Sequence, residues 1–283
     1  MNPISYFFDL IRTLKSGALA SVQTNHTLRA LRRDIFLSQI ACSDRYTEPK
    51  RLFLGAYKVF SESNEDGIIH EIFSRIGLES RQFVEIGVGD GLECNTAFLL
   101  TQGWKGTWID CSAEAVEKAR AHFSGYPVNI ACEAVTPANV NAVVAATFPA
   151  TSCDLLSIDV DSYDYYIWEA ITTLSPMVVV IEYNASFPPF VRQTIEYVPG
   201  SQPPVGTNYF GASLGALVEL GRRKGYSLVG CSLTGVNAFF VRNDLLGDHF
   251  CAPYTADNHY EPPRYGLIGQ MGHPPAIGNW VQN

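Results

Sequence analysis

The sequence predicts an α/β fold with a doubly wound, mostly parallel seven-stranded sheet, preceded by an N-terminal helical extension. From about residue 83, short apolar segments alternate with helical segments of about ten residues, the pattern of parallel strands joined by crossover helices. Residues 177–183 begin with a continuous apolar run, as strands covered on both faces do. A glycine-rich turn directly follows the first expected strand.

The individual elements follow from these patterns. The expected strands span residues 83–86, 106–110, 128–132, 154–159, 177–183, 226–231 and 238–242. The expected helices span residues 68–76, 97–100, 113–122, 139–146, 165–174 and 214–224. Thr234 and Gly235 lie between the last two strands and predict a hairpin there. We therefore expect three parts, which are a helical extension at 1–50, the main domain at 51–245 and a wrapping tail at 246–283.

Composition restricts the partners. The net charge of −8 argues against a broad nucleic-acid-binding face, because neutralising phosphates takes clustered Lys and Arg. Near the N-terminus, Asp9, Arg12 and Lys15 interrupt the apolar residues, so we expect a packing helix and no transmembrane segment. The seven cysteines are scattered without a Cys-x-x-Cys pair, which suits a reducing, cytoplasmic location. The oligomeric state stays open, a homo-oligomer included.

The glycine-rich turn at residues 87–91 has the spacing G-x-G-x-G. A dinucleotide-binding fingerprint needs G-x-G-x-x-G, and Leu92 stands where its third glycine would be. Glu85, on the strand before the turn, would repel a pyrophosphate and suits the positively charged amino and sulfonium groups of S-adenosylmethionine (SAM). Asp110 ends the next strand, where a carboxylate can accept hydrogen bonds from both ribose hydroxyls. These residues disfavour an NAD-dependent oxidoreductase and predict a SAM site.

Together these residues resemble motifs I and II of class I SAM-dependent methyltransferases, across residues 80–185 and more loosely 60–245. Residues 61–67 (SESNEDG) and 83–91 look most like the FkbM-like branch, many members of which methylate hydroxyls on sugars or secondary metabolites. The resemblance implies a Rossmann-like methyltransferase fold and transferase activity. The SAM-binding residues that it and the turn imply are Glu85, Gly87, Gly89, Asn95, Asp110, Cys111, Glu133 and Asp159.

Acidic residues follow the fourth and fifth strands. Asp159 and Asp161 lie two apart, as do Glu182 and Asn184, so their oxygen atoms are expected to converge at one sheet edge. Hard oxygen ligands suit Mg²⁺ or Mn²⁺, and we expect Asp159, Glu182 and Asn184 to be the metal ligands. The pattern is similar to metal-dependent O-methyltransferases of the catechol and caffeoyl-CoA kind, although Ser162 stands where that family has a lysine.

The missing lysine leaves the identity of the general base open. Asp161 is the first candidate for catalysis and His259, in the tail, the second. In the alternative interpretation, Asp161 and Asp164 merely cap the following helix. Metal dependence is likewise left open at this stage.

The long segment 187–213 is rich in aromatic residues, Pro and Asn, and is expected either to contact the acceptor or to form a self-packed surface loop. The expected function is SAM-dependent O-methylation of a sugar, a glycan precursor or a related oxygen-rich small molecule. Two alternatives stay open. One is a SAM- or nucleotide-binding protein without catalysis, and the other is an N-methyltransferase acting on a small amine.

Overall fold

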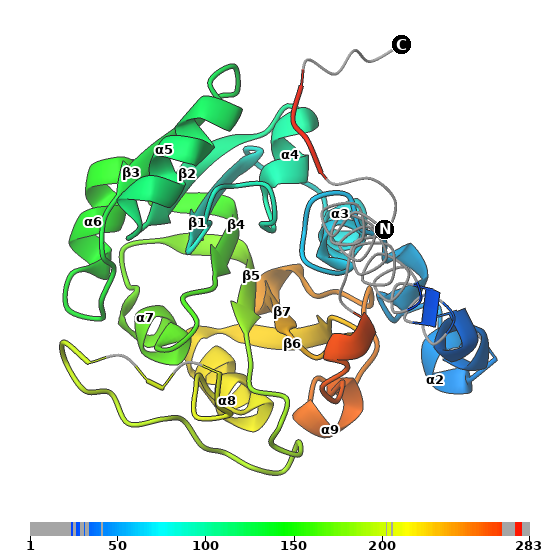
Figure 1. Cartoon of the computed structure of the whole chain (residues 1–283). Helices are drawn as coiled ribbons and strands as arrows, with labels where there is room; N and C mark the ends of the chain where they lie inside the picture. Colours follow the sequence, from blue (N-terminus) through cyan, green and yellow to red (C-terminus); the bar gives the residue numbers. More distant parts are fainter. Residues whose placement is uncertain are drawn as a thin grey trace, which may run out of the picture. The chain divides into compact units, whose positions relative to one another are not determined.

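The computed structural model describes residues 24, 27–28, 31, 34–40, 42–201, 203–204, 206–267 and 275–278. The chain divides into two compact units, Met1–Thr47 and Glu48–Asn283 (Figure 1). In the first unit, residues 34–40 are helical and are followed by α2 (Asp44–Thr47). The apolar helical face expected at Ile4, Phe7, Phe8, Ile11 and Leu14 lies outside the described residues.

The second unit contains one seven-stranded sheet with the order β3-β2-β1-β4-β5-β7-β6 (Figure 1). Its strands are β1 (Gln82–Ile86), β2 (Lys105–Asp110), β3 (Val128–Cys132), β4 (Ser152–Ile158), β5 (Ser175–Glu182), β6 (Tyr226–Cys231) and β7 (Asn237–Arg242). The pairs among β1 to β5 are parallel, whereas β7 is antiparallel to both β5 and β6. The predicted mostly parallel, doubly wound seven-stranded sheet with a terminal hairpin is therefore confirmed.

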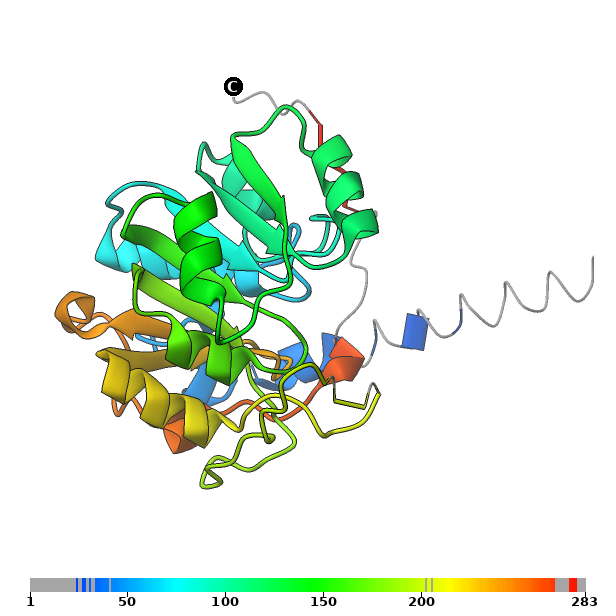
Figure 2. The ribbon, with the colours of Figure 1, turned by 90° about the vertical axis from the view of Figure 1, so that its left-hand side faces the viewer.

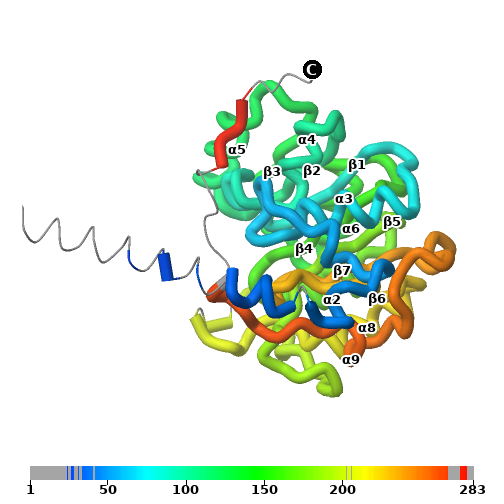
Figure 3. The backbone as a smooth tube through the Cα atoms, turned by 90° about the vertical axis from the view of Figure 1, so that its right-hand side faces the viewer, coloured from blue at the N-terminus to red at the C-terminus, as the bar shows by residue number. Residues whose placement is uncertain are grey.

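Helices cover both faces of the sheet. One buried cluster joins the sheet to α3 (Glu65–Ile76), α4 (Ala97–Thr101) and α5 (Ala113–His122). The other joins it to α6 (Val140–Thr147), α7 (Asp164–Ala170) and α8 (Leu214–Lys224). Figure 2 shows α6, α7 and α8 in a row along one face, and Figure 3 shows the opposite side, where α3 lies toward the viewer.

Local capping explains where two of these helices begin and end. Ser112 caps α5 by accepting a hydrogen bond from the Ala115 amide at 3.3 Å, so this helix begins where the sequence predicts. Helix α7 ends at Ala170, before the predicted Leu174, because Ile171 is extended. The Asn141 side chain then accepts hydrogen bonds from the next two backbone amides, which holds them out of the helix.

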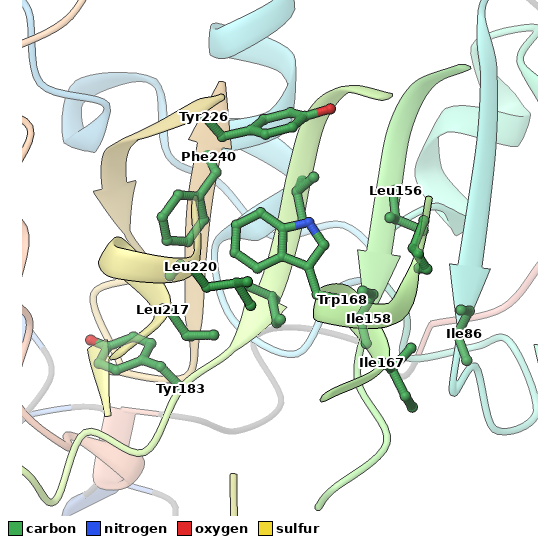
Figure 4. Packing of buried hydrophobic residues seen from close by; sticks show 14 of the residues in the cluster. Ile86, Leu156, Ile158, Ile167, Trp168, Tyr183, Leu217, Leu220, Tyr226 and Phe240 are labelled. Atoms are coloured by element: carbon green, nitrogen blue, oxygen red, sulfur yellow. The ribbon is translucent and has the colours of Figure 1, made fainter. Parts of the chain in front are cut away.

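The largest side chain between the sheet and α7 is Trp168 (Figure 4). Its ring lies 4.9 Å from that of Phe240 and 6.1 Å from that of Tyr226, and it is 1% exposed. A Cβ on Gly221 of α8 would come within 2.9 Å of Phe240, so glycine is needed for this close packing. The tryptophan fixes the position of α7, which follows directly after the loop that carries Asp161.

The segment after β7 continues over the domain through η2 (Asn243–Leu245), α9 (Ala256–His259) and η3 (Tyr265–Leu267). Phe250 is buried in the cluster of α3, α4 and α5. The Arg264 amide donates to the Thr234 carbonyl at 2.8 Å, so the segment also packs on the turn between β6 and β7. Across the described residues, none of the helices combines the length and the apolar character needed to cross a membrane.

Candidate functional site

A cavity of about 750 Å³ opens at the carboxyl ends of β1, β2, β4 and β5. This is the edge at which ligands bind in open α/β sheets. Eight carboxylate side chains line it, namely Glu62, Asp90, Glu93, Asp110, Glu133, Asp159, Asp161 and Glu182. The described residues of the lining include no lysine, arginine or histidine, although Glu93 is paired with Lys58 from outside the lining at 3.1 Å. The cavity therefore favours ligands that carry positive charge.

The glycine turn after β1 forms one wall of this cavity. Gly87 has a φ of +86°, and a Cβ there would lie 1.6 Å from the Asp159 carbonyl oxygen, so the turn packs directly on the loop after β4. Gly89 has a φ of +57°, and a Cβ on it would meet no atom within 4 Å. The first glycine thus permits the contact between the two loops, and the second leaves its backbone open to a ligand.

Glu85 lies elsewhere than the sequence predicted. Val84 and Ile86 point toward α6 and α7, so the intervening Glu85 points to the opposite face, where it is 1% exposed and outside the cavity lining. Its carboxylate accepts hydrogen bonds from the Asn95 and Thr96 amides at 2.9 and 3.1 Å and from the Thr96 hydroxyl. Burial raises its pKa. Glu85 therefore holds the loop after β1, and its direct contact with SAM stays a prediction.

Asn95 is likewise turned away from the cavity. It is 5% exposed, and its side-chain amide donates to the Ser157 hydroxyl at 3.1 Å. Asn95 therefore links the loop after β1 to β4. The structure does not bring Asn95 to the cavity lining, although the sequence motif placed it among the SAM ligands.

Asp110, Cys111 and Glu133 all line the cavity, as predicted from the ends of the second and third strands. The Asp110 carboxylate accepts one hydrogen bond from the Gly89 amide and one from the Ser112 amide, each at 2.8 Å and each to a different oxygen. A carboxylate oxygen has two lone pairs, so each oxygen keeps one acceptor position for a ligand diol. These amides also fix the carboxylate before any ligand arrives.

Strand register brings the acids of β4 and β5 together. Ile158 pairs with Ile181, which places Asp159 and Glu182 side by side where the two strands end. Asp159, Asp161 and Glu182 each offer an oxygen atom, and these atoms lie within 4.8 Å of one another. Glu182 Oε2 is buried and, within the described part of the chain, has no hydrogen-bond partner. A buried acceptor without a donor, facing two carboxylates, fits a divalent cation.

The carboxylates of this cluster repel one another. Burial raises the pKa of Asp159 well above its ordinary value, and the neighbouring Asp164 and Asp161 raise it further. The pKa of Glu182 is also raised well above its ordinary value, first by burial and then by Asp159 and Asp164. A cation, or a bound proton, is therefore needed to stabilise the cluster.

Asp161 occupies the place that the sequence gave to Asn184. Its φ is +58°, a left-handed conformation that few non-glycine residues adopt. The buried Asp164 carboxylate holds the surrounding loop by accepting hydrogen bonds from the Val160 and Ser162 amides at 2.8 and 3.2 Å. Asp164 thus organises the loop that precedes α7 and presents Asp161 to the cavity, which differs from the helix-capping interpretation of both residues.

Asn184 and His259 are both buried away from the cavity lining. The chain leaves the strand after Glu182, so the two-residue alternation does not extend to Asn184, whose side-chain amide donates to the Asn208 and Phe210 carbonyls at 2.8 and 3.0 Å. His259 Nε2 lies 2.9 Å from the Cys251 carbonyl oxygen. Neither side chain contacts the carboxylate cluster, so the expected metal ligand and the second candidate base are not brought to it.

Sequence reasoning missed Glu62 as a site residue. The buried Asp66 carboxylate accepts hydrogen bonds from three consecutive amides, at residues 59–61, and so folds the segment that brings Glu62 to the cavity. Burial raises the pKa of Glu62 to about 7, and Glu65, Glu93 and Asp161 add to this against the opposing charge of Lys58. The acidic residues of the 61–67 motif could have indicated a site residue here, but the motif was used only to identify a family resemblance.

The chain is only distantly similar to known proteins. No protein-family model and no curated protein matches the sequence. Among solved structures, a TehB-like SAM-dependent methyltransferase from Corynebacterium glutamicum is 12% identical with a TM-score of 0.39, over 62% of this chain and 86% of that one. A SAM-dependent methyltransferase from Mesorhizobium loti is 13% identical with a TM-score of 0.39, over 62% and 95%. CalS10, an amino pentose methyltransferase from Micromonospora echinaspora, is 11% identical with a TM-score of 0.40, over 63% and 89%.

Proposed function

We propose that this protein is a SAM-dependent O-methyltransferase of the FkbM-like branch, which transfers a methyl group to a hydroxyl of a sugar, a glycan precursor or a related oxygen-rich small molecule. The observation that carries the proposal is that one cavity contains both the glycine turn with Asp110 and the Asp159–Asp161–Glu182 cluster. The first group suits a nucleoside with a positively charged sulfonium, and the second suits the hydroxyl that accepts the methyl.

In the proposed donor site, the Asp110 carboxylate accepts hydrogen bonds from the ribose hydroxyls, and Glu133 lies toward the adenine. Gly89 has no side chain, so the ligand can approach its backbone closely. The carboxylates of the lining attract the sulfonium and ammonium groups. An anionic pyrophosphate would be repelled by the same groups, which supports SAM over a dinucleotide.

In the proposed acceptor site, Asp159, Asp161 and Glu182 would hold Mg²⁺ or Mn²⁺. When bound, the ion supplies positive charge that lowers the pKa of an acceptor hydroxyl. The hydroxyl oxygen attacks the methyl carbon in line with the carbon–sulfur bond, that bond breaks, and S-adenosylhomocysteine (SAH) leaves as a neutral thioether. The hydroxyl proton passes to a carboxylate, for which Asp161 is the proposed base.

N-methylation of a small amine is a second candidate, because the carboxylates that line the cavity would attract an ammonium group without any metal. The two candidates differ in their response to chelation. Methyl transfer from labelled SAM should reach hydroxylated acceptors and fall in EDTA if the first is right. Transfer to amines alone, unchanged by EDTA, would favour the second and remove the metal.

SAM binding itself is tested by thermal unfolding. SAM or SAH should raise the melting temperature, and Asp110→Ala should abolish the rise. Asp248→Ala, which removes an exposed carboxylate paired with Lys50, is the control and should leave the rise intact. Stabilisation by NAD but not by SAM would contradict the proposal. A cytoplasmic location and the absence of a nucleic-acid partner stay predictions that rest on composition.

A further inference from the structure

A group of tyrosine rings lies beside the loop that carries Asp161. Tyr163 precedes α7, Tyr166 lies within α7, and Tyr197 belongs to the segment 187–213. The rings of Tyr163 and Tyr197 meet edge to face at 4.9 Å, and those of Tyr166 and Tyr197 lie 5.5 Å apart. Tyr163 and Tyr197 both line the cavity and are half-buried, so they present aromatic surface to its contents. We call these two residues the tyrosine wall.

The wall is held in place by the protein itself. The Tyr166 hydroxyl donates to the Ile195 carbonyl at 2.8 Å and lies 3.0 Å from the Thr194 hydroxyl, which fixes the stretch just before Tyr197. The Gly211 amide donates to the Ser162 carbonyl at 3.0 Å, which ties the far end of the same segment to the loop after β4. A ligand therefore meets an aromatic surface that is already positioned, with little ordering left to do on binding.

The tyrosine wall and the Asp159–Asp161–Glu182 cluster meet at the loop after β4. Asp161 and Tyr163 are two residues apart, and both line the cavity. Glu182 Oε2, buried and without a donor among the described residues, lies in the same lining. One side of the acceptor site is thus aromatic, and the other consists of oxygen acceptors that attract a cation or donor groups.

The charge of the cavity lining also restricts which acceptors can bind. The described lining has carboxylates and no lysine, arginine or histidine, so no side chain there would pair with a phosphate or carboxylate on the acceptor. Within a cavity of low dielectric, two like charges repel each other over several ångströms. An acceptor that carries a phosphate would have to place it among carboxylates or outside the cavity.

We propose, resting on the proposed function, that the acceptor is a ring compound with neighbouring hydroxyls and no phosphate or carboxylate. Its ring lies against Tyr163 and Tyr197, and its hydroxyls face Asp159, Asp161 and Glu182. Aromatic side chains bind the apolar face of a pyranose or of a planar ring in this manner. Among glycan precursors, the site selects free or glycosidic sugars and rejects nucleotide-linked and phosphorylated ones.

Binding to SAH-loaded protein in the presence of Mg²⁺, measured by calorimetry, tests the charge requirement. Two neutral probes represent the two ring sources, namely methyl β-D-glucopyranoside and catechol. Their anionic counterparts are glucose 6-phosphate and 3,4-dihydroxybenzoate. We expect at least one neutral probe to bind, and its counterpart to bind about tenfold more weakly or worse. Equal or tighter binding of the anionic member, or binding of neither neutral probe, would overturn the proposal.

Variants of the wall test the ring requirement. Tyr197→Ala should weaken binding of the neutral probe about tenfold, whereas Tyr197→Phe keeps the ring and should restore most of the affinity. Tyr209→Ala is the matched control, because Tyr209 is an exposed tyrosine of the same segment that lies outside the lining. The same loss in Tyr197→Phe as in Tyr197→Ala would refute a stacking role.

The thermal shift by SAM separates this inference from the proposed function. If SAM stabilises the wild type and every tyrosine variant alike, but the probes show no charge or ring discrimination, only the acceptor proposal fails. If SAM and SAH stabilise none of the proteins, the proposed function fails first, and the acceptor proposal falls with it.

Discussion

Replacing Glu62 with glutamine should stabilise the empty protein, and should do so only at neutral and alkaline pH. Burial and three neighbouring carboxylates raise the pKa of Glu62 to about 7 in the folded protein, from an ordinary 4.5. The folded chain therefore keeps this proton over a pH range in which the unfolded chain has already released it. The free energy of unfolding must then fall as the pH rises from 4.5 to about 7, and stay constant above that.

The magnitude follows from the same two pKa values. Their separation corresponds to about 3 kcal/mol, and solvent around this partly exposed side chain reduces the effect to about 2 kcal/mol. Glutamine cannot ionise, so Glu62→Gln should gain that amount at pH 8 and nothing at pH 4.5. For a domain of this size the gain corresponds to about 4–8 °C in melting temperature.

Thermal unfolding followed by circular dichroism, in EDTA and without SAM, measures this effect at both pH values. Glu117→Gln is the matched control, because Glu117 is an exposed carboxylate paired with Arg120 on α5. It should change stability by less than about 0.5 kcal/mol at either pH. An equal gain in stability for Glu62→Gln at pH 4.5 and pH 8, or a loss at pH 8, would show that ionisation of Glu62 does not destabilise the folded protein.

Three further predictions concern the loops, the metal and the core. Gly87→Ala should lower the free energy of unfolding by more than about 3 kcal/mol, because its Cβ would lie 1.6 Å from a backbone oxygen. Gly89→Ala has open space around it and should cost about 1–2 kcal/mol, yet it should abolish the SAM-induced thermal shift. Equal losses of stability for the two variants in denaturant titrations would contradict this. Saturating Mg²⁺ at 100 times its dissociation constant should stabilise the wild type by about 2.7 kcal/mol, and Asp159→Asn or Glu182→Gln should remove that gain, so an unchanged response in calorimetry would exclude the cluster as the metal site. Trp168→Ala should cost about 3–5 kcal/mol, and a loss below 1 kcal/mol in chemical denaturation would show that α7 is not fixed by this ring.

The fold was predictable because its signals are local. The strands and most helices have apolar periodicity and end at capping residues or glycine, and the observed boundaries lie within a few residues of the expected ones. Helix α7 is the exception, because the side chain of Asn141, distant in sequence, holds the backbone after Ala170 extended. A contact between segments so far apart leaves no trace in the periodicity of either one.

The site was only partly predictable for the same reason. Residues at strand ends, such as Asp110 and Asp159, reach the cavity because parallel strands end at one edge. Glu85 was expected to face the ligand, but a motif fixes a position along the chain and leaves open which face of the strand the side chain takes. Asn184 was assigned by extending the strand alternation past its end. Glu62 was missed although its loop is folded by a residue close in sequence, the buried Asp66, because the acidic motif 61–67 was used only as a sign of family resemblance.

The position of β7 has a consequence for biosynthesis. The last strand of the described residues, β7, lies inside the sheet between β5 and β6. It supplies the partner of Glu182, and Val236, directly before it, lines the cavity. While the ribosome is still translating the preceding residues, the apolar edge of β5 has no neighbour. Exposed edges of this kind recruit other chains. The nascent protein should therefore depend on chaperones until β7 emerges from the ribosome. Truncations before Asn237 should aggregate.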